Sequence, residues 1–306
     1  MNVTADPLVS IVIPTYNHAH FLGRALQSVL DQTYTKWEVI LVDNHSQDNT
    51  DEVVQSFAEQ RIALLKIHNN GVIAASRNMG ILAANGEWIA FLDSDDFWYP
   101  EKLEIAVNGI QQDASVDVCS TDEMLVDEVS GTRRLLKYGP YCPDFYKKLL
   151  LEGNCLSPSA TLVRRDFMNR YGILFRENKE FVTAEDYDLW MRLAQAGAKF
   201  KFIHSVQGEY RIHAVNSSGQ IERHSQSVLN VAKDHAFEQQ HFQPDANKLW
   251  RKINARLMLA KARANVGRKQ FVPGTHALML AFRSSFLGSL WCIFSKFRKN
   301  IIKALT

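Results

Sequence analysis

Short apolar runs alternate with helical stretches over residues 9–112, and this alternation constrains the fold more than any other feature. Runs rich in β-branched and aromatic residues predict strands, and apolar residues that recur every three or four positions predict helices. The predicted strands span 9–13, 37–42, 61–67 and 87–92, and the predicted helices include 20–30, 72–84 and 101–112. Turn and cap residues at 46–50 predict a further helix that runs to about residue 59. Nearly continuous apolar strands that alternate with helices are typical of a mostly parallel sheet with helices on both faces. The sequence therefore predicts an α/β fold.

The pattern is less regular after residue 113. We expect strands over 116–125 and 199–210, a loop over 127–144, and helices over 165–170 and 183–196. Thr183 is the expected N-cap of the last of these helices, and Gly197 follows its expected end. From residue 221 onward the pattern is helical, with breaks near 243–244 and 272–274. We therefore expect an α/β domain over 1–220 and a helical C-terminal region over 221–306.

Polar and turn-forming residues follow three of the predicted strands. They are Pro14, Tyr16 and Asn17 after the first strand, Asp43 after the second, and Asp93, Ser94, Asp95 and Asp96 after the fourth. Because ligands bind beyond the carboxyl ends of the strands in such sheets, these residues predict a site at one edge. The three carboxylates would repel one another unless a cation lay among them, and Mg²⁺ or Mn²⁺ with bound phosphates would suit them. The simpler alternative is an acidic turn in which Asp95 or Asp96 caps the next helix.

The C-terminal region carries a large excess of positive charge. Residues 245–306 contain 13 Lys or Arg residues and one acidic residue, although the formal net charge of the whole chain is only +2. Apolar and aromatic side chains over 278–294 precede a basic run that contains Lys296, Arg298, Lys299 and Lys303. This combination is typical of an amphipathic helix at an anionic membrane surface. The alternative is a helix that packs on the domain with its basic side solvated. We expect no nucleic-acid partner, because no binding motif accompanies the basic stretch.

Cysteine spacing and the N-terminal composition bear on the cellular compartment. The four cysteines show no CxxC spacing, which favours free thiols in a reducing cytosol. Residues 1–7 lack the basic and apolar regions of a signal peptide. No window approaches the roughly 18 uninterrupted apolar residues of a spanning helix. We therefore expect a cytoplasmic protein without a membrane-spanning helix.

Several separate motifs occur in the order and spacing of one protein family. They are residues 9–17, 27–34, 38–50, 75–80 and 91–100, followed by Glu185-Asp186-Tyr187-Asp188-Leu189-Trp190 and Tyr210-Arg211-Ile212-His213. Over residues 8–216 the chain resembles the family 2 glycosyltransferases, which are inverting enzymes with the GT-A fold. The resemblance implies a Rossmann-like GT-A domain over 1–220, with a nucleotide-sugar half over 1–115 and an acceptor half over 116–220. The remaining residues lie outside it.

The resemblance implies transfer of a sugar from a nucleotide-diphospho-sugar, expected to be UDP-linked, to an acceptor hydroxyl with inversion at the anomeric carbon. Matching positions imply that the donor is bound by Pro14, Tyr16, Asn17, Asp43, Arg77, Asp93 and Ser94. They imply that Asp95 binds a divalent metal, Mn²⁺ or Mg²⁺, and that His213 is a ligand of this metal or of the diphosphate, with Asp96 and Glu185 as supporting residues. Asp186 is the implied general base, which accepts the proton of the acceptor hydroxyl. The family often has a second aspartate where this chain has Asn44, so the identity of the nucleotide stays open.

Each of these assignments has a structural alternative. A lone arginine on a helix, such as Arg77, is more often a surface residue, and a lone histidine such as His213 is more often structural. Acids in the first turn of a helix, including Asp186, are favoured by the helix dipole without any catalytic role. A nucleotidyltransferase is a competing enzyme class, but it would need a Gly-rich phosphate loop after the first strand, which residues 15–18 do not provide. The other competing class is a catalytically silent sugar-nucleotide-binding or scaffold protein.

The resemblance and the basic tail together predict a role in cell-surface polysaccharide or lipid-linked glycan synthesis. The acceptor would be a glycan or a lipid-linked intermediate. The protein would lie at the inner face of the plasma membrane, held peripherally by its C-terminal helices.

Overall fold

The computed structural model describes residues 6–213, 221–267, 271–285 and 289–290. Contacts within the chain define two compact units. Unit 1 comprises Met1–Tyr146 and Cys155–Asn216, and unit 2 comprises Lys147–Asn154 and Ser217–Thr306. The sheet and all of the predicted site residues belong to unit 1, whereas the described part of unit 2 is helical.

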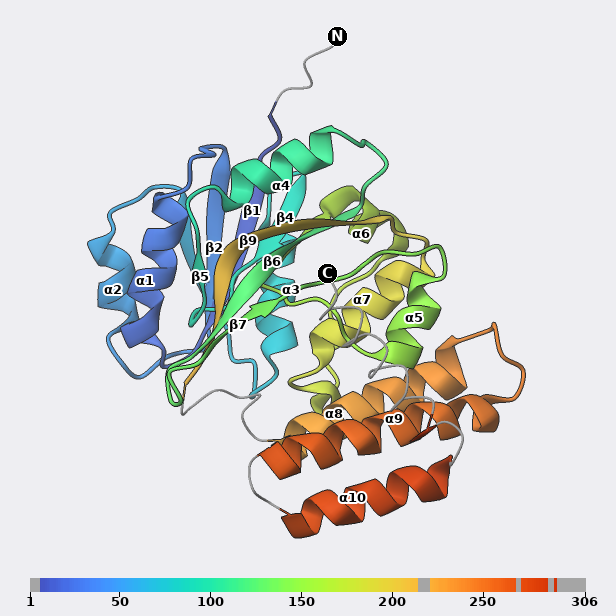
Figure 1. Cartoon of the computed structure of the whole chain (residues 1–306). Coiled ribbons are helices and arrows are strands. Elements are labelled where there is room, and N and C mark those ends of the chain that lie inside the picture. Colours follow the sequence, from blue (N-terminus) through green and yellow to red (C-terminus); the bar gives the residue numbers. More distant parts are fainter. Residues whose placement is uncertain (1–5, 214–220, 268–270, 286–288, 291–306) are drawn as a thin grey trace. The chain divides into compact units, whose positions relative to one another are not determined.

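The first half of unit 1 alternates strands and helices, as the sequence predicts (Figure 1). Its elements are β1 (Val9–Thr15), α1 (Ala19–Leu30), β2 (Trp37–Asp43), α2 (Thr50–Ser56), β3 (Ile62–Lys66), α3 (Ile73–Ala83) and β4 (Trp88–Phe91). These strands pair in the order β3-β2-β1-β4, and all of these pairings are parallel. The first strand was predicted to stop at Pro14, but β1 continues to Thr15. Within β1, only Val9–Val12 pair with β4, so Pro14 interrupts no hydrogen bonds on that side.

The second half of unit 1 adds strands that run in both directions. Its elements are β5 (Phe97–Trp98), α4 (Lys102–Gln111), β6 (Val118–Asp127), β7 (Arg133–Leu136), β8 (Thr161–Arg164), α6 (Arg165–Tyr171), the 3₁₀ helix η1 (Lys179–Phe181), α7 (Glu185–Gln195) and β9 (Phe200–Ile212). The sheet continues from β4 in the order β8-β6-β9-β5, with β7 paired to β6. β6 and β9 are parallel, whereas β8 is antiparallel to both of its neighbours. The loop predicted over 127–144 was wrong in part, since it contains β7.

Helices cover both faces of the parallel strands. Side chains of α1 and α4 share one apolar core with Ile11 and Val39, which point to the same face of the sheet. On the other face, α3 approaches β1 closely, and a Cβ added to Gly80 would lie 2.4 Å from Cγ1 of Val12. Figure 1 shows α1 and α2 on one side of β2 and α3 on the other. The parallel strands are therefore covered on both faces, and their carboxyl ends lie along one edge of the sheet.

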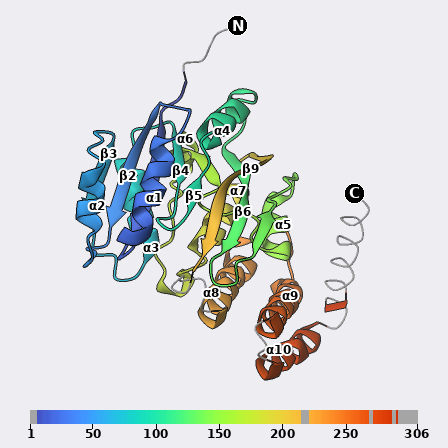
Figure 2. The ribbon, with the colours of Figure 1, turned by 60° about the vertical axis from the view of Figure 1, so that its left-hand side comes forward.

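Unit 2 contains helices that pack in sequence order. α5 (Phe145–Glu152) begins in unit 1 and ends in unit 2. α8 (Ile221–Asp234) leads into a π-helical turn, η3 (His235–Gln239), and is followed by α9 (Ala246–Gly267) and α10 (Phe271–Ser284). α9 packs against both α8 and α10 (Figure 2). α9 ends at Gly267 and α10 begins at Phe271, so the helix boundary predicted near 272–274 lies a few residues earlier; Pro273 falls in the first turn of α10, where a proline is tolerated. Among the described residues, no helix is long and apolar enough to cross a membrane.

Candidate active site

The loops that follow β1, β2 and β3 are tied into one rim. The backbone N–H of Asn17 donates to Ser46 Oγ at 2.8 Å, and the N–H of Gln47 donates to Asn17 Oδ1 at 2.7 Å. The amide oxygen of Asn44 accepts from the N–H of Asn69 at 2.9 Å. The amide of Asn44 therefore links the loops after β2 and β3. Asn17 has a φ of 52°, a left-handed conformation that asparagine adopts more readily than most residues.

Asp43 is a fully buried carboxylate at the end of β2. It accepts hydrogen bonds from the backbone N–H of Ser46 at 3.1 Å and from Lys66 Nζ at 2.7 Å. Pro14 lies inside β1, whereas the ring of Tyr16 is 52% exposed just beyond it. The hydrogen-bonded carboxylate of Asp43 and the exposed ring of Tyr16 therefore lie on the same rim.

The Asp93–Asp95 segment leaves β4 at the same edge of the sheet and is held by two histidines. Asp95 Oδ2 lies 2.9 Å from Nε2 of His213, which follows β9. Ser94 Oγ lies 2.9 Å from Nδ1 of His18, in the loop after β1. Burial lowers the pKa of His18, and the nearby Asp95 carboxylate opposes that shift. His18 was not predicted from the sequence, because no spacing rule connects it to Ser94; only the sheet topology brings them together.

Asp96 faces the protein interior and is 2% exposed. It accepts hydrogen bonds from the hydroxyl of Ser159 at 2.5 Å and from the backbone N–H of Arg211 at 2.9 Å. Burial raises the pKa of Asp96 well above its usual value, and the neighbouring carboxylates of Asp95 and Glu123 raise it further. This environment suits a supporting residue better than an exposed ligand.

Arg77 joins the acidic segment after β4 to the start of α7. Its Nη2 donates to Asp93 Oδ1 and its Nη1 donates to Glu185 Oε1, both at 2.6 Å. A lone arginine on a helix is usually exposed, but Arg77 is only 3% exposed and is therefore not a surface residue. The two carboxylates of the bridge come from motifs that lie far apart in the sequence.

The first turn of α7 carries three acids in different environments. Asp188 is fully buried and pairs with Arg176 and Arg192, while Glu185 pairs with Arg77. Asp186 is partly exposed and interacts electrostatically with Arg77. The N-cap prediction for Thr183 was wrong: Ala184 is the N-cap residue, and Thr183 precedes it with a φ of 80°. Gly197 follows the helix with a φ of 88°, as predicted.

The donor set near Asp95 fits a divalent cation. A partly exposed carboxylate and an imidazole lie within hydrogen-bond distance of each other, and Mn²⁺ accepts both ligand types. Asp93 and Ser94 precede Asp95 in the same segment; Asp93 Oδ1 accepts from Arg77, and Ser94 Oγ contacts His18. The residues present are therefore compatible with a metal that carries phosphates.

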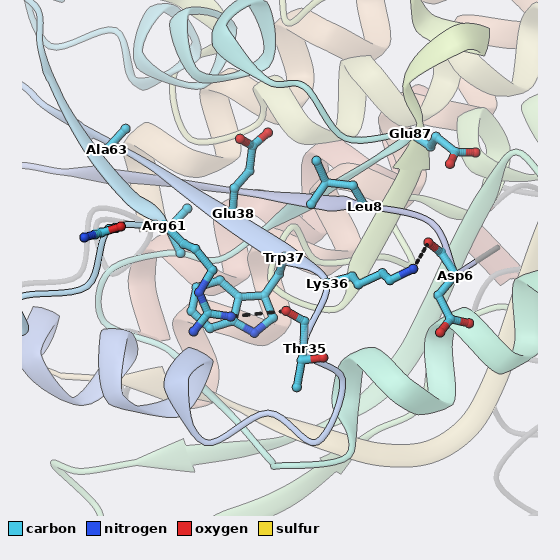
Figure 3. A pocket seen from close by; sticks show the side chains of 11 residues that line it. Asp6, Leu8, Thr35, Lys36, Trp37, Glu38, Arg61, Ala63 and Glu87 are labelled. Atoms are coloured by element: carbon cyan, nitrogen blue, oxygen red, sulfur yellow. Dashed lines mark hydrogen bonds between the residues drawn. The ribbon is translucent and has the colours of Figure 1, made fainter.

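A hollow of about 710 Å³ lies at the other end of β1 and β2 and does not belong to this site (Figure 3). Its basic groups already have protein partners. Lys36 Nζ donates to the carbonyl of Asp6 at 3.4 Å, and Arg61 Nη1 donates to the carbonyl of Thr35 at 3.1 Å. Nothing in this hollow resembles the acidic segment at the carboxyl edge.

Comparison with known proteins identifies the family of the chain. Residues 10–172, more than half of the chain, match the model of the family described as glycosyl transferase family 2. The chain therefore belongs to glycosyltransferase family 2. It is 34% identical over 189 residues, 61% of this chain and 70% of the relative, to the UDP-Glc:alpha-D-GlcNAc-diphosphoundecaprenol beta-1,3-glucosyltransferase WfgD of Escherichia coli. It is 31% identical over 229 residues to an uncharacterized glycosyltransferase of Rickettsia felis; this match covers 72% of the chain but only 36% of that protein.

Solved structures agree on the GT-A fold. S. aureus TarS 1–349 in complex with UDP-GlcNAc superposes with a TM-score of 0.65 at 16% identity, over 89% of this chain and 90% of that one. The mannosyltransferase PcManGT from Pyrobaculum calidifontis, in complex with GDP-Man and Mn²⁺, superposes with a TM-score of 0.62 at 22% identity, over 99% and 82% of the two chains. At these identities the likeness establishes the fold alone.

Proposed function

We propose that this protein is a metal-dependent inverting glycosyltransferase that moves a sugar from a UDP-sugar to a hydroxyl of a lipid-linked or cell-surface glycan acceptor. The observation that carries the proposal is the Arg77 bridge, which joins the acidic segment after β4 to the start of α7. Donor and acceptor chemistry need these two motifs side by side. The bridge speaks against a coincidental pair of acidic turns.

Each predicted residue has a role in this proposal. Pro14, Tyr16, Asn17 and Asp43 form the seat of the nucleoside, and Asp93 and Ser94 contact the ribose and diphosphate side. Asp95 and His213 would hold Mn²⁺ or Mg²⁺, which would stabilise the negative charge on the leaving nucleoside diphosphate. Asp96 and Glu185 support these groups from the protein interior. The nucleotide-sugar half then spans about 1–115 and the acceptor half about 116–220, a division that follows the family resemblance.

Asp186 is the proposed general base. It accepts the proton of the acceptor hydroxyl while that oxygen forms a bond to the anomeric carbon. The bond from the anomeric carbon to the diphosphate oxygen breaks on the opposite face, so the configuration inverts and the nucleoside diphosphate leaves with the electron pair. Its partial exposure allows Asp186 to meet an acceptor, whereas Glu185 and Asp188 are buried in ion pairs.

The nature of the donor rests on the relatives. WfgD is named for UDP-Glc and TarS was solved with UDP-GlcNAc, which supports a UDP-linked donor. PcManGT binds GDP-Man, so the fold also accommodates guanine. The WfgD acceptor is a diphosphoundecaprenol-linked sugar, which supports a lipid-linked acceptor for this chain.

A lipid-linked acceptor would place the enzyme at a membrane, and we propose α10 as part of the contact at the inner face of the plasma membrane. α10 buries small residues: Gly274, Ala277 and Ala281. It exposes large apolar ones: Phe271, Val272, Leu278 and Met279. Exposed apolar patches often mark interaction surfaces, and the surrounding basic charge suits anionic lipid. The basic run at 296–303 lies outside the described residues.

A thermal-shift panel of nucleoside diphosphates with and without Mn²⁺ tests the function directly. A ligand that binds only the folded state raises the melting temperature according to its affinity. We expect the largest shift with UDP plus Mn²⁺. Asp186→Asn should keep that shift and lose sugar transfer, because the amide cannot take a proton. If no nucleoside diphosphate raised the melting temperature, the protein would not bind a nucleotide donor. If Asp186→Asn still transferred sugar, Asp186 would not be the general base.

A further inference from the structure

Arg77 connects three segments of unit 1 that are remote in sequence. It lies on α3, Asp93 follows β4, and Glu185 is the first residue of α7. The Arg77 side chain is 3% exposed, the Glu185 side chain 6% and the Asp93 side chain 26%. The guanidinium therefore lies inside the protein, and of its two carboxylate partners Asp93 is the more accessible.

The guanidinium is occupied by protein groups rather than presented to a ligand. Both terminal nitrogens donate to carboxylates at 2.6 Å, and the guanidinium carbon lies 5.3 Å from the ring centre of Phe175. The buried Nε of Arg77 and Oε2 of Glu185 have no hydrogen-bond partner. Burying such charges costs stability even when they are paired, and unpartnered buried atoms add to that cost. Stability alone is therefore a poor explanation for the bridge.

We infer that Arg77 is a positioning residue that sets the distance between the donor-binding carboxylate of Asp93 and the start of α7, where Asp186 lies. This inference rests on the proposed function and deepens it: Arg77, expected from the family resemblance to contact the donor, acts through Asp93 and Glu185. Arg77 uses Oδ1 of Asp93, which leaves the side chain's other oxygen for the donor. Asp186 follows Glu185 directly in the first turn of α7.

The geometry of arginine suits this role, and lysine cannot replace it. The guanidinium is planar and holds its nitrogens in a fixed fork, so movement of one carboxylate is passed to the other. A lysine ammonium at the same place is a single point charge on a flexible stem. Misplacement of a catalytic group by about 1 Å can lower the rate on the order of 100-fold. The bridge should therefore matter more for kcat than for donor affinity.

The test compares Arg77→Lys, Glu185→Gln and the double variant with a matched control, Arg170→Lys, whose ion pair with Asp166 is exposed. Steady-state kinetics give kcat and both KM values, and calorimetry gives the Kd of UDP with Mn²⁺. We expect each single variant to lose about 10- to 100-fold in kcat. The Kd of UDP should stay within about threefold for Glu185→Gln, and the double variant should lose no more than Arg77→Lys, because both changes break one bridge. The control should match the wild type.

A second measurement tests the bridge without using activity. Hydrogen exchange at residues 188–191, the first hydrogen-bonded amides of α7, should accelerate about tenfold or more in both single variants, because a charged hydrogen bond has been weakened. The exchange of β1 and β2 should not change. Unchanged α7 exchange, or additive losses of kcat, would overturn the bridge; a loss confined to the Kd of UDP would make Arg77 a donor ligand instead. If the wild type neither binds UDP nor transfers sugar, the proposed function fails, while the exchange data still decide on the bridge.

Discussion

Replacing Lys102 with methionine should change how the stability of the fold depends on pH. Lys102 lies in the first turn of α4 and is 1% exposed. Its Nζ donates to Thr121 Oγ1 at 2.7 Å and to the carbonyl of Ala160 at 2.6 Å. Burial lowers the pKa of Lys102 from the ordinary value of 10.5 to about 8, and the Glu123 carboxylate opposes this shift. The charged form is therefore disfavoured in the folded protein.

The direction and size of the effect follow from these pKa values. Below about pH 8, Lys102 is protonated in both the folded and the unfolded chain, so its contribution does not depend on pH. Between about pH 8 and 10.5 the unfolded chain holds a proton that the folded chain has released, so the free energy of unfolding rises with pH. At about 1.4 kcal/mol per pH unit, the rise amounts to about 3 kcal/mol. The methionine variant lacks this contribution.

Urea unfolding of both proteins at several values between pH 7.5 and 10.5 provides the assay. Groups that titrate in this range and do not interact with Lys102 cancel in the difference, which should grow by about 3 kcal/mol in favour of the wild type as pH rises. Lys36→Met, at an exposed position, should show no such trend. Equal m values are needed for the comparison. Two parallel curves for wild type and Lys102→Met would refute the argument and show that burial does not lower the pKa of Lys102.

Three further variants test the site and the C-terminal region. Asp95→Asn should remove the Mn²⁺-dependent part of the thermal shift produced by UDP while leaving the shift with UDP alone; an intact metal effect would exclude Asp95 as a ligand. Asp43→Asn should weaken UDP binding about 10- to 100-fold in calorimetry, because a buried carboxylate with charged hydrogen bonds loses its charge. Unchanged affinity would show that the uracil ring binds elsewhere. Serine at both Leu278 and Met279 should reduce flotation with anionic liposomes, whereas serine at Leu82, a 74% exposed leucine of unit 1, should not; equal flotation of all three proteins would favour simple packing of α10.

The sequence by itself determined the parallel half of the sheet. Apolar runs and helical spacing are local signals, and they predicted β1 to β4 and the intervening helices to within a few residues. Polar residues at the ends of these strands predicted a shared edge, because parallel strands bring their carboxyl ends together. The two-residue β5 and the four-residue β7 were missed, since each is a strand only through its pairing with β9 or β6.

Only the tertiary structure decided how the site is held together. Arg77 could not be assigned to Asp93 and Glu185 from the sequence, because 16 and 108 residues separate these partners. The contact of His18 with Ser94 and the use of Asn44 to bind the backbone of Asn69 were equally hidden. Residue patterns report the local periodicity of burial, whereas ion pairs and hydrogen bonds depend on which segments the completed fold brings within a few ångströms of each other.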